Sequence, residues 1–200
     1  MTEEGKRLIH AAYTDEAITV YQAYAPEIAG PAVRAGTFVP PFSRGRMTWI
    51  KPSFGWIMHR SGWGRKPGQE CVLAISITRT GFEWALANSC LSSYEHDVYP
   101  RREAWEAVKK SSPVRVQWDP DRSLRGGPLG YRAIQVGLSG EAANRYVDEW
   151  IRSITDITGL VHEVESKICA GSRIAEVARE LPVERVYPLD DTLAARIGAG

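Results

Sequence analysis

The chain has 200 residues, of which 44% are hydrophobic and 24% charged, a composition that predicts a globular protein with one sizeable core. Its formal net charge of +1 provides no overall basic field, so any binding of a polyanion requires a local patch. Three distant cysteines without a C-x-x-C pair, no signal-peptide pattern and no apolar run of about 20 residues predict a cytoplasmic protein without disulfides, structural zinc or a membrane span.

The first predicted strand covers residues 18–24, which are β-branched and aromatic. Pro26 suits the first turn of a following helix, and Gly36 is the expected stop of that helix. The proline- and glycine-containing stretch 37–50 then predicts a loop. This part of the chain is therefore expected to run from strand to helix to loop.

A short helix is expected after this loop, because Ser53 can cap its first turn and Gly62 can end it. Residues 71–78 alternate apolar and polar side chains and predict a strand. The sequence from Thr80 to Glu83 has the pattern of a capping box, which predicts a helix that opens here and continues to about residue 88.

The middle of the chain predicts a polar loop over residues 89–99 and a helix over residues 100–110. Two alternating segments, residues 114–118 and 132–138, predict strands. An Asp-Pro pair opens the stretch between them, residues 119–128, and this chemistry is typical of a turn.

The clearest helical pattern follows Ser139, the expected cap, and its apolar residues keep helical spacing as far as Ile154. Short helices are expected from about residue 156 onward. Because strands and helices mix without strict alternation, we predict a single α+β domain, a mainly antiparallel sheet with helices packed on it. Within it we expect an N-terminal extension (residues 1–17), a mixed α/β core (18–138) and a helical C-terminal part (139–200).

One segment, residues 44–63, combines arginine, lysine and tryptophan more densely than the rest of the chain. Arginine binds phosphate through paired hydrogen bonds, lysine adds a point charge, and tryptophan faces stack on bases. A helix start at Ser53 also offers free N–H groups to a phosphate. The alternative interpretation is that the tryptophans belong to the core and the arginines extend into solvent. From this segment we select Lys51 as a candidate catalytic residue, and Arg46, Trp49, Ser53 and Arg60 as candidate ligand-binding residues.

The predicted strands add further polar candidates. Gln22 offers an amide that can recognise a carboxamide or a base edge. Small residues on either side of Gln135 leave room for a ligand or for a packed helix. Residues 115–122 end a strand, where sites are often built, although a turn with a surface ion pair explains the same pattern. We add Asp119 and Gln135 as candidate catalytic residues, and Gln22, Arg115, Gln117, Arg122 and Arg132 as candidate ligand-binding residues.

Familiar catalytic motifs do not occur in the sequence. Glu95, His96 and Asp97 resemble a metal site in composition only, because adjacent loop residues rarely converge on one ion, and we predict no metal. There is no P-loop, dinucleotide-binding fingerprint, zinc-protease motif or nucleophile elbow. Cys90 has no histidine at a spacing typical of thiol enzymes.

Three segments, RMTWIKPSFGWIMHRSGW, PVRVQWDPDR and YRAIQVGLSGEA, resemble the domain of unknown function 4291 family, and the resemblance extends over residues 18–197. It implies an intracellular bacterial or fungal protein and no particular activity. In the order of its first elements the chain also resembles the ADP-ribosyltransferase fold, which implies NAD as a ligand. Such enzymes usually carry His or Arg where Gln22 stands, and a catalytic Glu on a late strand where this chain has Gln135-Val136-Gly137.

These observations lead to three hypotheses of function. The first is a nucleotide-binding enzyme, a transferase that uses NAD or another nucleotide in an anionic-ligand pocket lined by Arg, Lys and Trp. The second is a protein that binds or processes RNA or single-stranded nucleic acid. A variant of the second is nucleotidyl transfer through Lys51, although the Lys-x-Asp-Gly motif of RNA ligases is absent. The third is a non-catalytic interaction domain.

Overall fold

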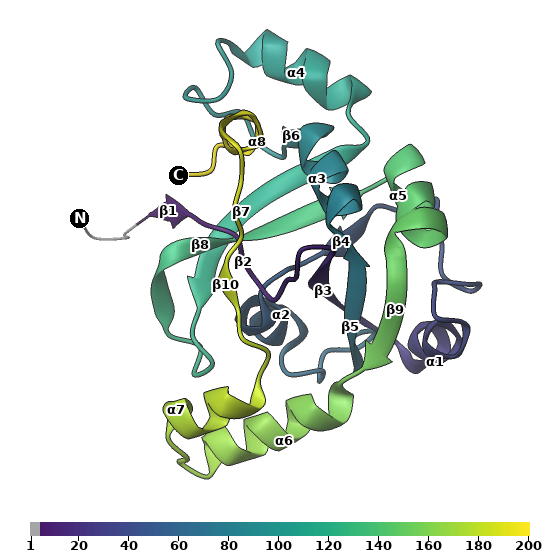
Figure 1. Cartoon of the computed structure of the whole chain (residues 1–200), viewed down its shortest axis with the longest axis vertical. Helices are drawn as coiled ribbons and strands as arrows, with labels where there is room; N and C mark the ends of the chain where they lie inside the picture. Colours follow the sequence, from purple (N-terminus) through teal and green to yellow (C-terminus); the bar gives the residue numbers. More distant parts are fainter. Residues whose placement is uncertain (1–4) are drawn as a thin grey trace.

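Two larger β-sheets form the framework of the protein in the computed structural model, which describes residues 5–200 (Figure 1). A third sheet consists of the short antiparallel strands β2 (His10–Ala11) and β10 (Arg185–Val186). The larger sheet contains β1 (Lys6–Arg7), β4 (Thr48–Ile50), β6 (Ser89–Leu91), β7 (Val114–Arg122) and β8 (Pro128–Leu138). β7 and β8 form a long antiparallel pair, and β4 is also antiparallel to β8. β1 and β6 are added in parallel, to β8 and β7 respectively.

The smaller sheet has the order β3 (Ala17–Tyr24), β5 (Cys71–Thr78) and β9 (Ile151–Asp156), with antiparallel pairing throughout. The two sheets are joined by a backbone bridge. The N–H of Tyr21 donates to the carbonyl of Lys51 (2.7 Å), and the N–H of Lys51 donates to the carbonyl of Tyr21 (3.2 Å). The mixed architecture with mostly antiparallel strands confirms the predicted α+β fold.

Helices and short turns surround the sheets. They are α1 (Pro26–Ala35), α2 (Phe54–Ser61), α3 (Arg79–Ala87), α4 (Arg102–Ser111), α5 (Glu141–Arg145), the π-helical turn η1 (Tyr146–Trp150), α6 (Thr158–Cys169), α7 (Ile174–Val177), the 3-10 turn η2 (Ala178–Glu180) and α8 (Asp191–Ile197). In Figure 1, α4 lies at one end of the molecule, and α6 and α7 lie at the opposite end. None of the helices in residues 5–200 has the length and apolar character that crossing a membrane requires.

The main core combines apolar side chains from both sheets and from α3. Val20 and Ile75 come from the smaller sheet, Val116 and Val136 from the larger sheet, and Phe82 from α3. A second cluster unites residues of the smaller sheet with α2 and α6. It includes Tyr21, Phe54, Ile57, Val72 and Val161. The smaller sheet is therefore packed against apolar side chains on both faces, which makes it a rigid support.

Several predicted helix ends are confirmed. Pro26 lies in the first turn of α1, and Gly36 follows the last turn with a φ angle of 71°. The Ser53 hydroxyl caps α2 by accepting a hydrogen bond from the N–H of Trp56 (3.3 Å), and Gly62 follows α2 with a φ angle of 57°. Local chemistry decides these positions, which explains why the sequence predicts them well.

The helix predicted to run from Ser139 to Ile154 is wrong over its last four residues. The helical turns end at Trp150, and Ile151 begins β9, so the C-terminal part is not purely helical. Ile151 and Ile154 are three residues apart, which is helical spacing, but pairing with the edge of β5 overrides this local pattern and forms a strand. The Ser139 hydroxyl does not cap the helix but donates to the carbonyl of Pro113 (2.9 Å).

The turn predicted at Asp119 and Pro120 is also wrong. Both residues lie inside β7, and the connection to β8 is shorter, covering residues 123–127. Pro120 has no N–H group to donate, and it lies beside a shift of strand register between Pro120 and Arg122. Such irregularities are where proline is tolerated in a sheet.

Three smaller corrections concern two short strands and the start of one helix. The predicted loops at 37–50 and 89–99 each contain a short strand, β4 and β6. The helix predicted to open at Thr80 begins at Arg79 instead. Its cap is Thr78, whose hydroxyl accepts a hydrogen bond from the N–H of Gly81 (3.1 Å).

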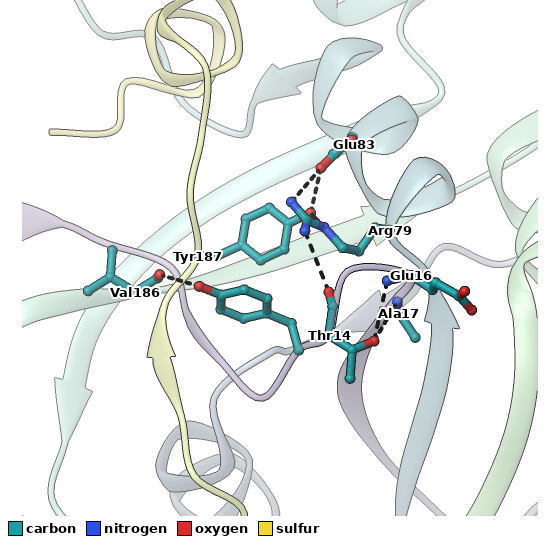
Figure 2. A network of polar contacts seen from close by, with 8 residues as sticks. Thr14, Glu16, Ala17, Arg79, Glu83, Val186 and Tyr187 are labelled. Atoms are coloured by element: carbon teal, nitrogen blue, oxygen red, sulfur yellow. Dashed lines mark hydrogen bonds and ion pairs between the residues drawn. The ribbon is translucent and has the colours of Figure 1, made fainter.

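A polar network holds the C-terminal segment against α3 (Figure 2). The Tyr187 hydroxyl donates to Glu83 Oε1 (2.6 Å) and accepts from Arg79 Nε (2.9 Å). Arg79 also forms an ion pair with Glu83 (3.3 Å), so the three side chains satisfy one another. Nearby, Tyr13 donates to the carbonyl of Val186 (3.1 Å). These contacts thus connect Val186 of β10 (Arg185–Val186) to Tyr13, and Tyr187 to α3.

Tyr187→Phe removes the hydroxyl that satisfies both Arg79 and Glu83, and we expect it to lower the free energy of unfolding by about 1–3 kcal/mol. Tyr13→Phe removes a hydroxyl at an exposed position, so its expected cost is below about 1 kcal/mol. Urea unfolding followed by circular dichroism measures both values. Equal losses in the two variants would contradict the anchoring role of Tyr187.

Candidate functional site

A cavity of about 490 Å³ opens where the two sheets meet. It is bordered by the end of β3, by α1, by residues 41–49 and by residues 68–69. The predicted site residues in its lining are Gln22, Arg46, Trp49 and Lys51. The structure therefore brings one residue of the first long strand together with three from the segment rich in arginine, lysine and tryptophan.

Lys51 is a buried cation in the wall of this cavity. Its side chain is only 8% exposed, and its Nζ donates to the carbonyl of Trp49 (3.0 Å). Among residues 5–200, no carboxylate forms an ion pair with Lys51. Burial, helped by the charge of Arg60, lowers the pKa of Lys51 to about 8, and the charge of Asp119 offsets part of this shift.

Asp119 is held by two glutamines on the larger sheet. Its Oδ1 accepts from Gln117 Nε2 (2.9 Å), and its Oδ2 accepts from Gln135 Nε2 (2.5 Å). Ile50 on β4 pairs with Val136 on β8, so continuing this register by one residue puts Lys51 beside Gln135. Asp119 and Gln135 therefore lie on the paired strands β7 and β8, and Lys51 follows directly after the neighbouring strand β4, although only Lys51 lines the cavity.

Gln22 lines the cavity, but its amide already has protein partners. Its Nε2 donates to the hydroxyls of Thr48 (2.6 Å) and Tyr24 (2.9 Å), and its Oε1 accepts from the Tyr146 hydroxyl (2.8 Å). Burial raises the pKa of Tyr24 to about 12, so this phenol keeps its proton. Gln22 thus orients the hydroxyls of Thr48 and Tyr24, two lining groups that are not among the predicted site residues.

Arg46 differs from its neighbour Arg44 in its contacts. Arg44 forms a two-pronged ion pair with Asp148 (2.6 and 2.7 Å) and does not line the cavity. Arg46 is exposed, lines the cavity, and forms no ion pair with any residue in the described part of the chain. An exposed guanidinium without a partner is available to an anionic ligand.

The tryptophans divide between the core and the cavity. Trp56 is 5% exposed, whereas Trp49 is partly exposed and lines the cavity. A Cβ atom on Gly137 would lie 2.7 Å from Met47 Sδ and 3.0 Å from the Trp49 ring. The space predicted beside Gln135 is thus filled by the side chains of Met47 and Trp49, and neither a ligand nor a packed helix occupies it.

Other predicted ligand-binding arginines lie away from the cavity. Arg115 donates to backbone carbonyl groups at and just after the end of α4. Arg132 donates to the carbonyl of Trp118 (3.3 Å) and borders a different hollow. Arg60 is exposed near the end of α2 and reaches the cavity only through the effect of its charge on Lys51.

A second cleft, of about 360 Å³, lies at the start of α2. Ser53 and Arg122 line it, together with two carboxyl groups, Asp121 and Glu184, that the sequence did not single out. The N–H of Phe54 donates to Glu184 Oε1 (2.6 Å), and the Ser53 hydroxyl accepts a second N–H of the helix. The phosphate cradle predicted at Ser53 is therefore filled by acceptors from the protein itself.

Both carboxyl groups of this cleft are hard to ionise. Burial raises the pKa of Asp121 to about 6. Burial, with a smaller contribution from the charge of Asp121, raises the pKa of Glu184 to about 8. No local pattern marks Glu184, because its partner Phe54 lies 130 positions earlier in the sequence.

No group of three or more His, Cys, Asp or Glu side chains gathers around a common point in residues 5–200. In the Glu95-His96-Asp97 stretch, Glu95 pairs with Arg7 (2.5 Å), and His96 contacts Asp97 (2.7 Å).

The raised pKa of Glu184 has a consequence for stability. The folded state holds a proton that the unfolded state releases between about pH 4.5 and pH 8, so stability falls as pH rises through this range. Glu184→Gln keeps an acceptor for Phe54 and removes the titration. We expect the variant to gain stability relative to the wild type as pH rises, by up to about 1.4 kcal/mol per pH unit.

Urea unfolding at several pH values measures this difference. Glu106→Gln, at an exposed position of α4, is the control and should follow the wild type. A constant difference between Glu184→Gln and the wild type from about pH 5 to pH 8 would contradict the assignment.

Comparison with known proteins agrees with the first of the two resemblances, to the domain of unknown function 4291 family. No curated protein matches the sequence. The resemblance to the ADP-ribosyltransferase fold stays a prediction. One family model matches residues 8–187, which is most of the chain, and it includes every element that borders the cavity. The chain therefore belongs to the family described as Domain of unknown function (DUF4291).

Proposed function

We propose that the protein is a nucleotide-binding transferase whose ligand occupies the cavity between the two sheets. NAD is the first donor to test, and Lys51 and Arg46 bind its phosphates. One observation carries the proposal. The Lys51 amine is buried in the cavity wall with one carbonyl as its hydrogen-bond partner and, in residues 5–200, no acidic partner.

An ammonium group in this position favours an anionic ligand. Burying a charge without a partner costs free energy, and the lowered pKa of Lys51 reports that cost. A bound phosphate would supply the missing counter-charge and would accept the remaining N–H groups of the amine. Arg46, also without an ion pair among the described residues, adds a planar group that binds phosphate oxygens in pairs.

The other lining groups suit a nucleotide better than a simple anion. Phe42 and Trp49 place aromatic rings in the cavity wall, and such rings stack on bases or on nicotinamide. The volume of about 490 Å³ lies within the usual range for sites that hold small organic ligands. The resemblance of the first elements to ADP-ribosyltransferases points to NAD, because in that fold a polar residue of the first strand contacts NAD. Gln22 has that place in this chain, and its amide orients the Thr48 and Tyr24 hydroxyls that line the cavity.

In this proposal the protein acts mainly by placing charge. Lys51 and Arg46 stabilise the negative charge that develops on the phosphates or on the leaving group during transfer. Asp119 is a positioning residue. Its carboxylate holds Gln117 and Gln135, and its charge keeps the pKa of Lys51 from falling further.

Isothermal titration calorimetry with NAD, ADP-ribose and ATP tests the binding step. We expect at least one of them to bind, and expect Lys51→Met and Arg46→Ala each to weaken binding roughly 10- to 100-fold, the loss of a charged hydrogen bond. Arg44→Ala is the matched control, because Arg44 pairs with Asp148 outside the cavity, and it should bind like the wild type.

The absence of binding at millimolar concentrations of all three compounds would contradict the proposal. Binding of oligonucleotides alone, with an affinity that falls steeply as salt rises, would replace it with nucleic-acid binding.

The affinity for the nucleotide should depend on the protonation of Lys51. Below pH 8 the amine is mostly charged and binds phosphate, whereas above pH 8 it loses its proton and its attraction for the anion. We therefore expect the wild-type affinity to fall between about pH 7 and pH 9.5, and the remaining affinity of Lys51→Met to be flat over the same range. Parallel pH profiles for the two proteins would show that Lys51 does not contact the anion.

A further inference from the structure

The Lys51 amine meets the two conditions that turn lysine into a nucleophile. Proteins activate lysine by removing it from water and by placing a second cation nearby, because both favour the neutral amine. Lys51 is 8% exposed, and Arg60 lowers its pKa further. At pH 7.5 roughly a quarter of an amine with a pKa of about 8 is neutral, against about 0.1% of an ordinary lysine.

The cavity also separates the two cations by depth. Arg46 is exposed, whereas Lys51 is buried, although both line the same cavity. A ligand with an anionic group at one end can therefore place that group on Arg46 while its other end reaches Lys51. The hydroxyls of Thr48 and Tyr24 lie in the same lining, hydrogen-bonded to each other (2.7 Å), and offer polar contacts to an oxygen atom of the ligand.

We propose that Lys51 forms an imine with an aldehyde or ketone that carries a phosphate or a similar anionic group. The lone pair of the neutral Nζ attacks the carbonyl carbon as the C=O π bond breaks, and one proton passes from the nitrogen to the carbonyl oxygen. The resulting carbinolamine loses its hydroxyl group and the second N–H proton as water while the C=N bond forms, so no oxidant or reductant is required. A site with little access to solvent favours this loss of water. The inference rests on the anion binding proposed above.

Pyridoxal 5′-phosphate, an aldehyde with a phosphate group, is a suitable probe, and sodium borohydride converts its imine into a stable secondary amine. We expect brief treatment of the full-length protein near pH 7.5 to attach one reduced probe per chain, with peptide mapping locating it on Lys51. The rate of labelling should rise with pH and level off above about pH 8. Inorganic phosphate or a bound nucleotide should slow it.

Two lysine variants separate this site from ordinary surface reactivity. Lys51→Arg keeps a positive charge but removes the nucleophile, so the selective label should be lost. Lys110→Arg, at an exposed position of α4, should be labelled like the wild type. Labelling of Lys51→Arg at the wild-type rate, or equal labelling of many surface lysines in the wild type, would overturn the inference.

The outcome also distinguishes this inference from the proposed function. If the probe binds reversibly and competes with the nucleotide but leaves no adduct on Lys51, the imine is excluded and the nucleotide site is retained. If neither the probe nor any nucleotide binds, both proposals are overturned.

Discussion

The backbone bridge between Tyr21 and Lys51 is the constraint on which the site depends. Two hydrogen bonds, of 2.7 and 3.2 Å, tie the residue after β4 to the middle of β3 and so join the two sheets. The Tyr21 ring packs edge-on against Phe54 in the second apolar cluster, with ring centroids 5.7 Å apart. Lys51 is therefore held in the interior by its backbone, and the burial of its amine needs no ion pair to maintain it.

The charges around α2 are arranged in two unequal groups. On the side of the cavity, Lys51 and Arg46 lack acidic partners within residues 5–200, and Asp119, whose charge acts on Lys51, is bound by two glutamines. On the side of the second cleft, Asp121 and Glu184 are buried and hard to ionise. Lys51 and Arg46 thus line the cavity, whereas the second cleft, where the sequence predicts a phosphate site at Ser53, contains two buried carboxyl groups.

The parts of the structure that follow from local chemistry were predictable from the sequence. Gly36 and Ser53 end and begin helices through contacts within a few residues, and Arg46, Trp49 and Lys51 share a site because they are close in the chain. The features that could not be predicted depend on contacts with other secondary-structure elements. The guanidinium of Arg115 is taken by carbonyl groups of α4 and the turn after it, and β9 forms where a helix was expected because β5 offers a free edge.

The same reasoning explains the residues that sequence analysis missed. Glu184 reaches the start of α2 from 130 positions away, and nothing near it in the sequence indicates this contact. Tyr24 and Thr48 belong to the site because the Gln22 amide donates hydrogen bonds to both of their hydroxyls. These hydrogen bonds form because β3 and β4 lie side by side in the fold, and the local spacing of residues does not predict this long-range contact.

The central claim is that Lys51 carries a buried amine whose charge is weakly held in the free protein. An NMR titration that follows the Lys51 side chain, assigned by its disappearance in Lys51→Met, measures this property directly. We expect a midpoint near pH 8 in the free protein and a higher midpoint when a nucleotide is bound. A midpoint near 10.4, the ordinary value for lysine, that does not move with any nucleotide would contradict it.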